Sequence, residues 1–353
     1  MRRLFVLAGL LLLLAGCGGA DSRAPFTDSR IPPSLGPRFW APEGWAWGLI
    51  GVGDAPVQRY GVSSTMGTPR GNILILSDDR EIAEAWFETA RDLNTMGYSV
   101  WVLERAGQGG SARYSGGPRD LIHAPTFDDD VAATKALARS IVTADSETPL
   151  TVVGQGVGAL IALRAVQTGA PAAALVLSSP NLKPDGALPG WPQWLMKLGA
   201  GRLPAGVGQG WKREGPDDFK AGRTQDRQRG AVQLAWQTAN PDLRMGGHSL
   251  GWTAGFAALA KAAEGRLSST RTPTLMMAGG DANIADRGVA ACEVMPACTL
   301  GGVVNRPSKP VGASLFLAPD DTRTWWLRRL TCQAPEHPHL PAPDREVVCP
   351  IEG

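Results

Sequence analysis

The stretch Val152-Val153-Gly154-Gln155-Gly156-Val157-Gly158-Ala159 decides the fold. It joins a short apolar run at 150–153, typical of a buried strand, to a stretch of small residues at 158–168 with the length of a helix. Gly154 and Gly158 let the chain turn sharply and let the helix lie close to the strand, because neither residue carries a β-carbon. The sequence therefore predicts a strand–turn–helix unit whose central residue, Gly156, has no side chain.

Strands and helices are predicted to alternate on both sides of this turn. The predicted strands are 71–76, 98–103, 150–153, 173–177 and 273–278, and the predicted helices are 82–93, 128–142, 158–168 and 253–264. This alternation indicates an α/β fold with a mostly parallel central sheet flanked by helices.

One segment interrupts the alternation. Residues 183–250 are rich in Trp, Gly and Pro, and we expect them to form a small cap over a ligand cleft, because their tryptophans need apolar surface to cover. The alternative is a surface excursion without a ligand.

The composition excludes some classes of protein. Of 353 residues, 43% are hydrophobic, which supplies enough apolar material for a large core and excludes a disordered chain. Lys and Arg number 35 against 33 for Asp and Glu. This near balance argues against nucleic acid or an anionic membrane surface as an electrostatic partner.

The first residues indicate export. A basic start, Met1-Arg2-Arg3, precedes an apolar run at 4–15 that is too short to span a bilayer. Leu14-Ala15-Gly16-Cys17 resembles the lipobox of bacterial lipoproteins. The resemblance implies a signal peptide at 1–16, an acylated Cys17 that anchors the chain in a membrane, and a tether at 17–44. Gly18 after the cysteine implies sorting to the outer membrane, facing the periplasm. The alternative is an ordinary cleaved secretion signal.

The remaining cysteines are an even number, all late in the chain: Cys292, Cys298, Cys332 and Cys349. In an exported protein such a set predicts two disulfides. Three pairings are possible, and we expect Cys292–Cys298 and Cys332–Cys349 because they close the shortest loops. The second pair would lie in a C-terminal tail at 331–353. A zinc site is the alternative, but the spacings are not C-x-x-C.

Several separated motifs resemble one family. Arg105-Ala106-Gly107-Gln108-Gly109-Gly110-Ser111, His123 with Phe127, Gly246-Gly247-His248-Ser249-Leu250-Gly251-Trp252 and Gly280-Asp281 occur in the order found in the lysophospholipase and monoacylglycerol-lipase branch of the α/β-hydrolases. The resemblance covers roughly 60–330 and implies an α/β-hydrolase domain at 45–330, with the cap at about 183–250. It also makes the Gly156 turn the counterpart of the G-x-S-x-G nucleophile elbow.

The resemblance also implies that several catalytic positions have lost their chemistry. Gly156 stands at the nucleophile position, and alignment of Asp320 and Arg323 with the motif of the last helix places Ala313 at the triad histidine. Asp281 matches the triad aspartate, but it has no imidazole to orient. The oxyanion positions fall on Ser77, Asp78 and Val157. A carboxylate at 78 would oppose the negative charge that an oxyanion hole stabilises.

The sequence therefore predicts an envelope lipoprotein with a catalytically degenerate α/β-hydrolase fold. We expect no cofactor, no metal and no nucleic acid partner, and either a lipid or acyl ligand under the cap or an envelope protein partner. Calcium at Asp78-Asp79 or at 128–130 is a weaker alternative, since acidic groups are common at loop and helix starts.

An active enzyme is the main alternative. It would be a serine esterase or lysophospholipase with a relocated nucleophile, for which Ser111, Ser178 and Ser179 are the candidates. Such a serine needs a base within hydrogen-bond reach, and His123 or His248 would have to supply it.

Overall fold

The computed structural model describes residues 24–114, 118–144, 147–182, 199–207, 210–280, 282–303, 305–306, 309–310 and 312–339. Three predicted functional residues, Cys17, Asp281 and Cys349, lie outside the described residues.

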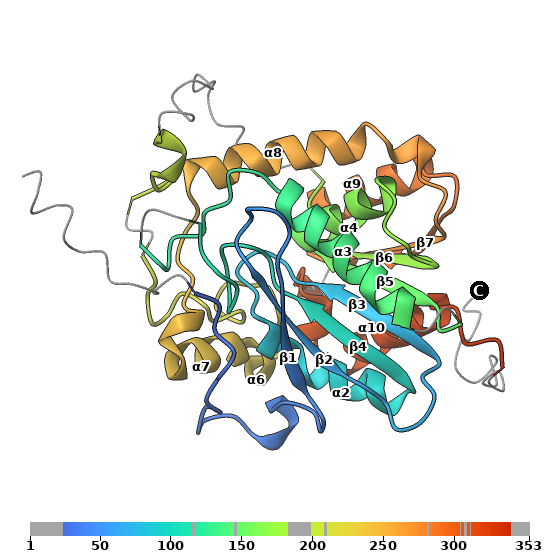
Figure 1. Ribbon diagram of the computed structural model, residues 1–353, viewed down its shortest axis with the longest axis horizontal. Helices are drawn as coiled ribbons and strands as arrows, with labels where there is room; N and C mark the ends of the chain where they lie inside the picture. Colours follow the sequence, from blue (N-terminus) through green and yellow to red (C-terminus); the bar gives the residue numbers. More distant parts are fainter. Residues whose placement is uncertain are drawn as a thin grey trace, which may run out of the picture.

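An eight-stranded sheet forms the centre of the molecule (Figure 1). Its strands are β1 (Ala46–Ile50), β2 (Gln58–Ser63), β3 (Gly71–Leu76), β4 (Tyr98–Leu103), β5 (Leu150–Gln155), β6 (Ala174–Ser178), β7 (Thr274–Ala278) and β8 (Cys298–Val303). They follow the order β1-β2-β4-β3-β5-β6-β7-β8. Only the pairs β1–β2 and β2–β4 are antiparallel. The predicted α/β class and mostly parallel sheet are confirmed.

Helices cover both faces of this sheet (Figure 1). The longer ones are α2 (Phe87–Thr95), α3 (Asp128–Ala144), α4 (Val157–Gln167), α8 (Leu250–Glu264), α9 (Ala282–Val294) and α10 (Asp320–Gln333). Helices α3, α4 and α8 pack together on one face, while α2 and α10 lie on the other. Strands β3 and β5 are buried at every residue, as expected for parallel strands covered on both sides. No helix among the described residues has the length and apolar character needed to cross a bilayer.

The predicted helix at 82–93 begins later than its hydrophobic period indicated. A 3₁₀ turn, η2 (Ala83–Trp86), comes first, and α2 starts at Phe87. The buried Arg59 guanidinium binds the carboxylates of Glu84 and Glu104, and Glu104 also accepts a hydrogen bond from the N–H of Ala83. These contacts join segments that are distant in sequence, and they stabilise the 3₁₀ turn η2. The hydrophobic spacing of residues 82–93 gives no information about such contacts.

A tether was predicted at 17–44, but part of this segment is packed on the folded domain. Leu35 and Phe39 are buried in the core, and the N–H of Phe26 donates to the carbonyl of Gly110. The side chain of Arg91 donates to the carbonyl of Trp40. The segment from 26 onward therefore belongs to the folded domain, because its few apolar side chains find a place in the core.

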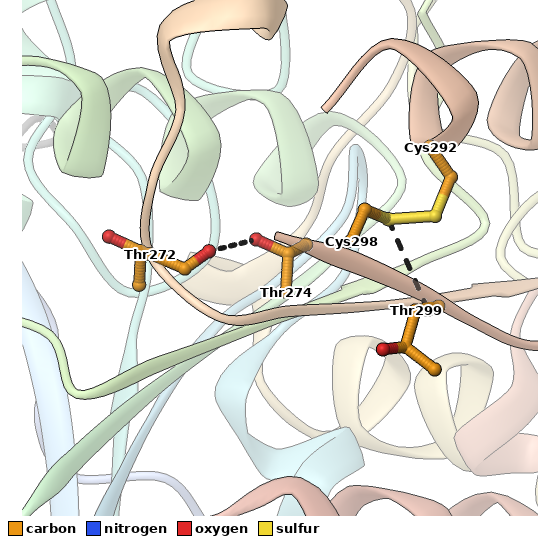
Figure 2. The surroundings of a disulfide bond; sticks show 5 residues. All are labelled: Thr272, Thr274, Cys292, Cys298 and Thr299. Atoms are coloured by element: carbon orange, nitrogen blue, oxygen red, sulfur yellow. Dashed lines mark hydrogen bonds between the residues drawn. A yellow bond between two sulfur atoms is a disulfide. The ribbon is translucent and has the colours of Figure 1, made fainter. Parts of the chain in front are cut away.

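The predicted disulfide Cys292–Cys298 is confirmed (Figure 2). It joins the C-terminal end of α9 to the first residue of β8, with the two Cα atoms 5.3 Å apart. Cys332 lies within α10 and is also disulfide-bonded. Its pairing with Cys349 stays a prediction, since Cys349 is not described.

The described part of the cap segment contains four short helices: η3 (Ala200–Arg202), α6 (Arg227–Gly230), α7 (Val232–Ala239) and η4 (Pro241–Leu243). Trp236 of α7 is buried and meets the ring of Phe87 edge-on, with centroids 5.5 Å apart. One cap tryptophan thus packs on the core.

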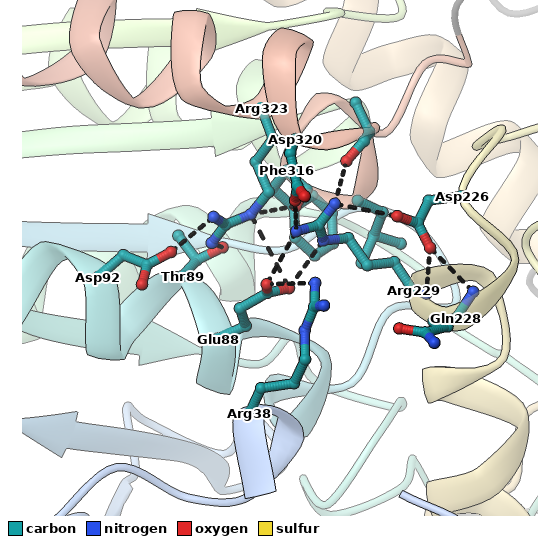
Figure 3. Close-up of polar contacts among 12 residues, drawn as sticks. Arg38, Glu88, Thr89, Asp92, Asp226, Gln228, Arg229, Phe316, Asp320 and Arg323 are labelled. Atoms are coloured by element: carbon teal, nitrogen blue, oxygen red, sulfur yellow. Dashed lines mark hydrogen bonds and ion pairs between the residues drawn. The ribbon is translucent and has the colours of Figure 1, made fainter. Parts of the chain in front are cut away.

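An ion-pair network joins α6 to helices α2 and α10 (Figure 3). The buried Arg229 of α6 binds both carboxylate oxygens of Glu88 on α2, each at 2.9 Å, and also binds Asp320 on α10. Burial alone would lower the pKa of Arg229, but the hydrogen bonds and charges of Glu88 and Asp320 raise it. Arg229 therefore stays charged and holds cap and core together.

Candidate active site at the β5–α4 turn

Gly156 forms the turn between β5 and α4, with φ +53° and ψ −113°. Its φ lies in the region that favours glycine, because a β-carbon there is strained. Its N–H donates to the carbonyl of Ser178 at the end of β6. A β-carbon on Gly158 would collide with the backbone oxygens of Leu76 and Ser77. The small residues therefore let α4 begin directly against the ends of β3 and β5.

The carboxylate of Asp78 lies on this turn. Asp78 follows β3, and its Oδ1 accepts hydrogen bonds from the backbone N–H groups of Val157 and Asp79, both at 2.7 Å. A β-carbon on Gly156 would overlap the carboxylate of Asp78. The Asp78 side chain therefore fills the space into which a side chain at position 156 would project.

Asp78 shares this place with a second buried carboxyl group. Glu81 Oε2 accepts the N–H of Asp78 at 2.9 Å. Burial and the charge of Asp79 raise the pKa of Asp78, while the N–H of Val157 opposes that shift. Burial and the charge of Asp78 raise the pKa of Glu81 well above its usual value. The pKa values of both carboxyl groups therefore lie above their ordinary values.

His248 forms a hydrogen bond with Asp79. Its Nε2 lies 2.7 Å from Asp79 Oδ2, and its ring stacks on Trp252 with centroids 3.8 Å apart. Burial would raise the pKa of Asp79, but the nearby charges of His248, Arg80 and Arg105 lower it overall. The cap end that resembled the family motif thus supplies a partner for Asp79.

Ala313, the position predicted for the triad histidine, lies close to the β5–α4 turn. Gln155, next to the turn, donates from Nε2 to the carbonyl of Ala313 at 2.8 Å. A β-carbon on Gly280 would lie 3.2 Å from the Ala313 β-carbon. Gln155, Ala313 and Gly280 therefore lie close together beside the turn. A methyl group at 313 cannot transfer a proton.

The candidate relocated nucleophiles are buried and have structural partners. Ser111 Oγ accepts the N–H of Arg59 and donates to the carbonyl of Glu104. Ser178 Oγ accepts from the indole Nε1 of Trp326, and Ser179 Oγ accepts from the N–H of Gly279. Within the described part of the chain, none of these three serines bonds to a histidine.

His123 contacts Ser249, which is not one of the three predicted candidate nucleophiles. Its Nδ1 lies 2.8 Å from Ser249 Oγ, and this oxygen also accepts the N–H of Trp252 and so caps α8. Ser249 is fully buried. Its hydroxyl caps the N-terminus of α8 and also contacts the His123 ring, so it has a structural role. A Ser three residues before the N–H it caps was a visible signal for this role.

The other acidic candidates also have partners. Asp130 accepts the N–H of Ala106 at 2.9 Å, and Asp129 accepts the hydroxyl of Tyr114 at 2.7 Å. Among the described residues, no group of three or more His, Cys, Asp or Glu side chains is arranged to hold a metal ion.

A family model described as serine aminopeptidase, S33 matches residues 67–295, which run from before β3 to the end of α9. The chain belongs to this hydrolase family. No match was found among curated proteins.

Solved structures show that the S33 chain has the fold of lipases. A soluble variant of monoglyceride lipase from Saccharomyces cerevisiae is 14% identical, with a TM-score of 0.58 over 87% of this chain and 97% of that one. An open-form lipase is 13% identical, with a TM-score of 0.63 over 82% and 99%. Monoacylglycerol lipase from Paleococcus ferrophilus is 17% identical, with a TM-score of 0.54 over 78% and 98%. At these identities the likeness concerns the fold.

A cavity of about 350 Å³ lies beside Arg80, in the loop that follows β3 of this S33 protein. Its walls come from the described cap residues, from the segment that leads into α8, and from Arg80. Basic side chains are prominent among them: Arg80, Lys212, Arg223 and His248.

Proposed function

We propose that this S33 family member is a non-hydrolysing binding protein of the cell envelope. One observation carries the proposal: the N–H of Val157 donates to the chain's own Asp78 carboxylate at 2.7 Å. An oxyanion hole works only if its N–H groups point at a position that a substrate oxygen can enter. Here a carboxyl group holds that position.

The nucleophile and base positions support the same proposal. Gly156 offers no nucleophilic atom, and Asp78 leaves no room for a side chain there. Ala313, at the position of the triad histidine, offers no base. Nucleophile, base and oxyanion donor are independent requirements for acyl transfer, so the loss of all three is a stronger argument than the loss of one.

An active esterase is the second candidate, favoured by the family and by the lipase fold. It requires a nucleophile outside the elbow. The buried positions and structural hydrogen bonds of Ser111, Ser178 and Ser179 argue against each of them.

The proposed ligand is a lipid or acyl compound bound beneath the cap, and the alternative is an envelope protein that docks on the cap. Support comes from the cavity of about 350 Å³, since a cleft survives the loss of catalysis. The proposed location is the periplasmic face of the outer membrane, with Cys17 as the acylated anchor. Support for the location comes from the sequence Leu14–Cys17.

Two measurements test the two parts of this proposal. Purified protein should resist labelling by a serine-reactive fluorophosphonate under conditions that fully label an active monoacylglycerol lipase. Labelling that maps to any serine would favour the esterase. Native mass spectrometry of the same preparation should show a bound lipid, and the absence of any lipid would favour a protein partner.

The anchor is tested by cell fractionation. Wild-type protein should remain with membranes after a salt wash, while Cys17→Ala should be released. Equal retention of both would contradict the lipoprotein assignment.

A further inference from the structure

We propose that the cap cavity binds the anionic group of its ligand, a carboxylate or a phosphate, with Lys212 as the principal contact and Arg80 and Arg223 beside it. This inference rests on the proposed binding function and names the chemistry of the bound group.

The charge of the cavity wall is the first argument. Four basic side chains line the cavity, Arg80, Lys212, Arg223 and His248, and no carboxylate stands among the described lining residues. The positive charges of Arg80, Lys212 and Arg223 around one space repel each other, and a bound anion relieves that repulsion.

Three of the four basic side chains already have a carboxylate partner, and these partners are not lining residues. Arg80 and His248 share one carboxylate, that of Asp79, and Arg223 pairs with the buried Asp218. Neither Asp79 nor Asp218 is a lining residue of the cavity.

Lys212 is different from the other three bases. It is exposed, and it is in none of the ion pairs among the described residues. A lysine that lines a cavity without a carboxylate partner has its charge available for an incoming anion.

Asp78 and Glu81 also face Arg223 and raise its pKa together with Asp218. Burial raises the pKa of both carboxyl groups, and the charge of Asp79 adds to this on Asp78, as that of Asp78 does on Glu81. Arg223 therefore remains a charged wall residue.

The backbone of the wall supports a built site. Arg80 adopts φ +58°, a conformation that a non-glycine residue rarely takes and that the surrounding structure must hold. Gly246 and Gly247 line the wall without side chains and leave room beside His248. Met245 and Val207 add apolar surface, which suits an anion with an organic part.

The test is isothermal titration calorimetry at low ionic strength with the purified full-length chain. The probes are inorganic phosphate, hexyl phosphate and hexanoate, with 1-hexanol as the neutral counterpart of hexanoate. Saturable binding of the anions, with hexanoate tighter than hexanol, is expected. Tighter binding of hexyl phosphate than of phosphate would identify an amphiphile as the ligand class, while equal binding would identify a small anion; both support the site.

Two matched variants distinguish binding in the cavity from nonspecific attraction of anions to the positive charge of the protein. Lys212→Gln should weaken anion binding about tenfold, as expected for the loss of one charge-assisted hydrogen bond. Lys220→Gln removes the same charge from an exposed cap position outside the cavity lining and should bind as the wild type does. Both positions are exposed, so neither change should prevent folding.

The proposal is overturned if no anion binds saturably, if hexanol binds as tightly as hexanoate, or if the two lysine variants behave alike. Such a result would leave the non-hydrolytic assignment untouched, since that assignment depends on fluorophosphonate labelling and ester turnover and not on anion binding.

Discussion

The backbone N–H of Val157 donates a 2.7 Å hydrogen bond to Oδ1 of Asp78, and so the first turn of α4 binds an acid from the loop after β3. In an α/β-hydrolase this N–H would face the substrate oxygen. Removal of one oxyanion donor from such a site costs about 10²–10³ in kcat. A carboxyl group placed on the donor has at least the same consequence, because it also excludes the substrate oxygen.

The space at position 156 is predicted to be closed by Asp78. Gly156→Ala should destabilise the protein by about 2–4 kcal/mol, which combines backbone strain at φ +53° with overlap of the carboxylate. In an Asp78→Gly background the same change should cost about 1–2 kcal/mol, the strain alone. Urea denaturation of the four proteins gives the coupling energy.

Gly169→Ala is the matched control for this cycle. Gly169 has φ +92°, and a β-carbon there would meet nothing within 4 Å. It should therefore report backbone strain without overlap. If Gly156→Ala costs no more than Gly169→Ala, the carboxylate does not fill the turn.

Reconstruction of the catalytic site is predicted to need three changes. Gly156→Ser alone should be inert, because position 313 supplies no base and Asp78 occupies the serine's space. Addition of Ala313→His should give weak ester turnover at best, and Asp78→Gly should then raise kcat by about 10²-fold or more. Initial rates with p-nitrophenyl butyrate measure the series. Full activity of the single Gly156→Ser variant would show that the oxyanion site is open.

Five of the eight strands of the sheet, β3 to β7, were predicted from the sequence because they are continuous apolar runs. β3 and β4 have the predicted bounds, and β5, β6 and β7 differ by one or two residues at an end. The turn at Gly156 was also predictable, since Gly154 and Gly158 are placed where only close packing requires them.

Two features of the site were not predictable in the same way. The sequence suggested that Asp78 would oppose an oxyanion, but its hydrogen bond to Val157 depends on how the loop after β3 folds over α4. The basic cavity is assembled from residues far apart, such as Arg80, Lys212 and His248, and no local pattern brings them together.

The cap is predicted to depend on Arg229. Arg229→Met removes the contacts with Glu88 and Asp320 and leaves the partly buried Glu88 carboxylate with fewer partners. We expect a loss of about 3 kcal/mol in the free energy of unfolding and faster tryptic cleavage within the cap. Arg227→Met, on the same helix but exposed, is the control and should change stability little. Equal proteolysis of the two variants would contradict the role of the network.

Stability is predicted to depend on pH through Asp130. Burial raises the pKa of Asp130 to about 7, against the opposing effect of Arg105 and the N–H of Ala106. A carboxyl group with a raised pKa contributes stability at low pH, and this contribution is lost as the pH rises from about 4 to about 7. Relative to Asp130→Asn, the wild type should therefore lose on the order of 2–4 kcal/mol across this range. Urea denaturation at several pH values measures the difference, with exposed Asp128→Asn as the control. A constant difference between wild type and Asp130→Asn would show that Asp130 is ionised throughout.

The most direct test of the central claim is the turnover of a short p-nitrophenyl ester by the wild-type protein. With Asp78 on the N–H of Val157, glycine at 156 and alanine at 313, the account predicts a rate equal to that of a heat-denatured sample. A rate well above that background, abolished by a fluorophosphonate, would contradict it and would place an active nucleophile elsewhere in the chain.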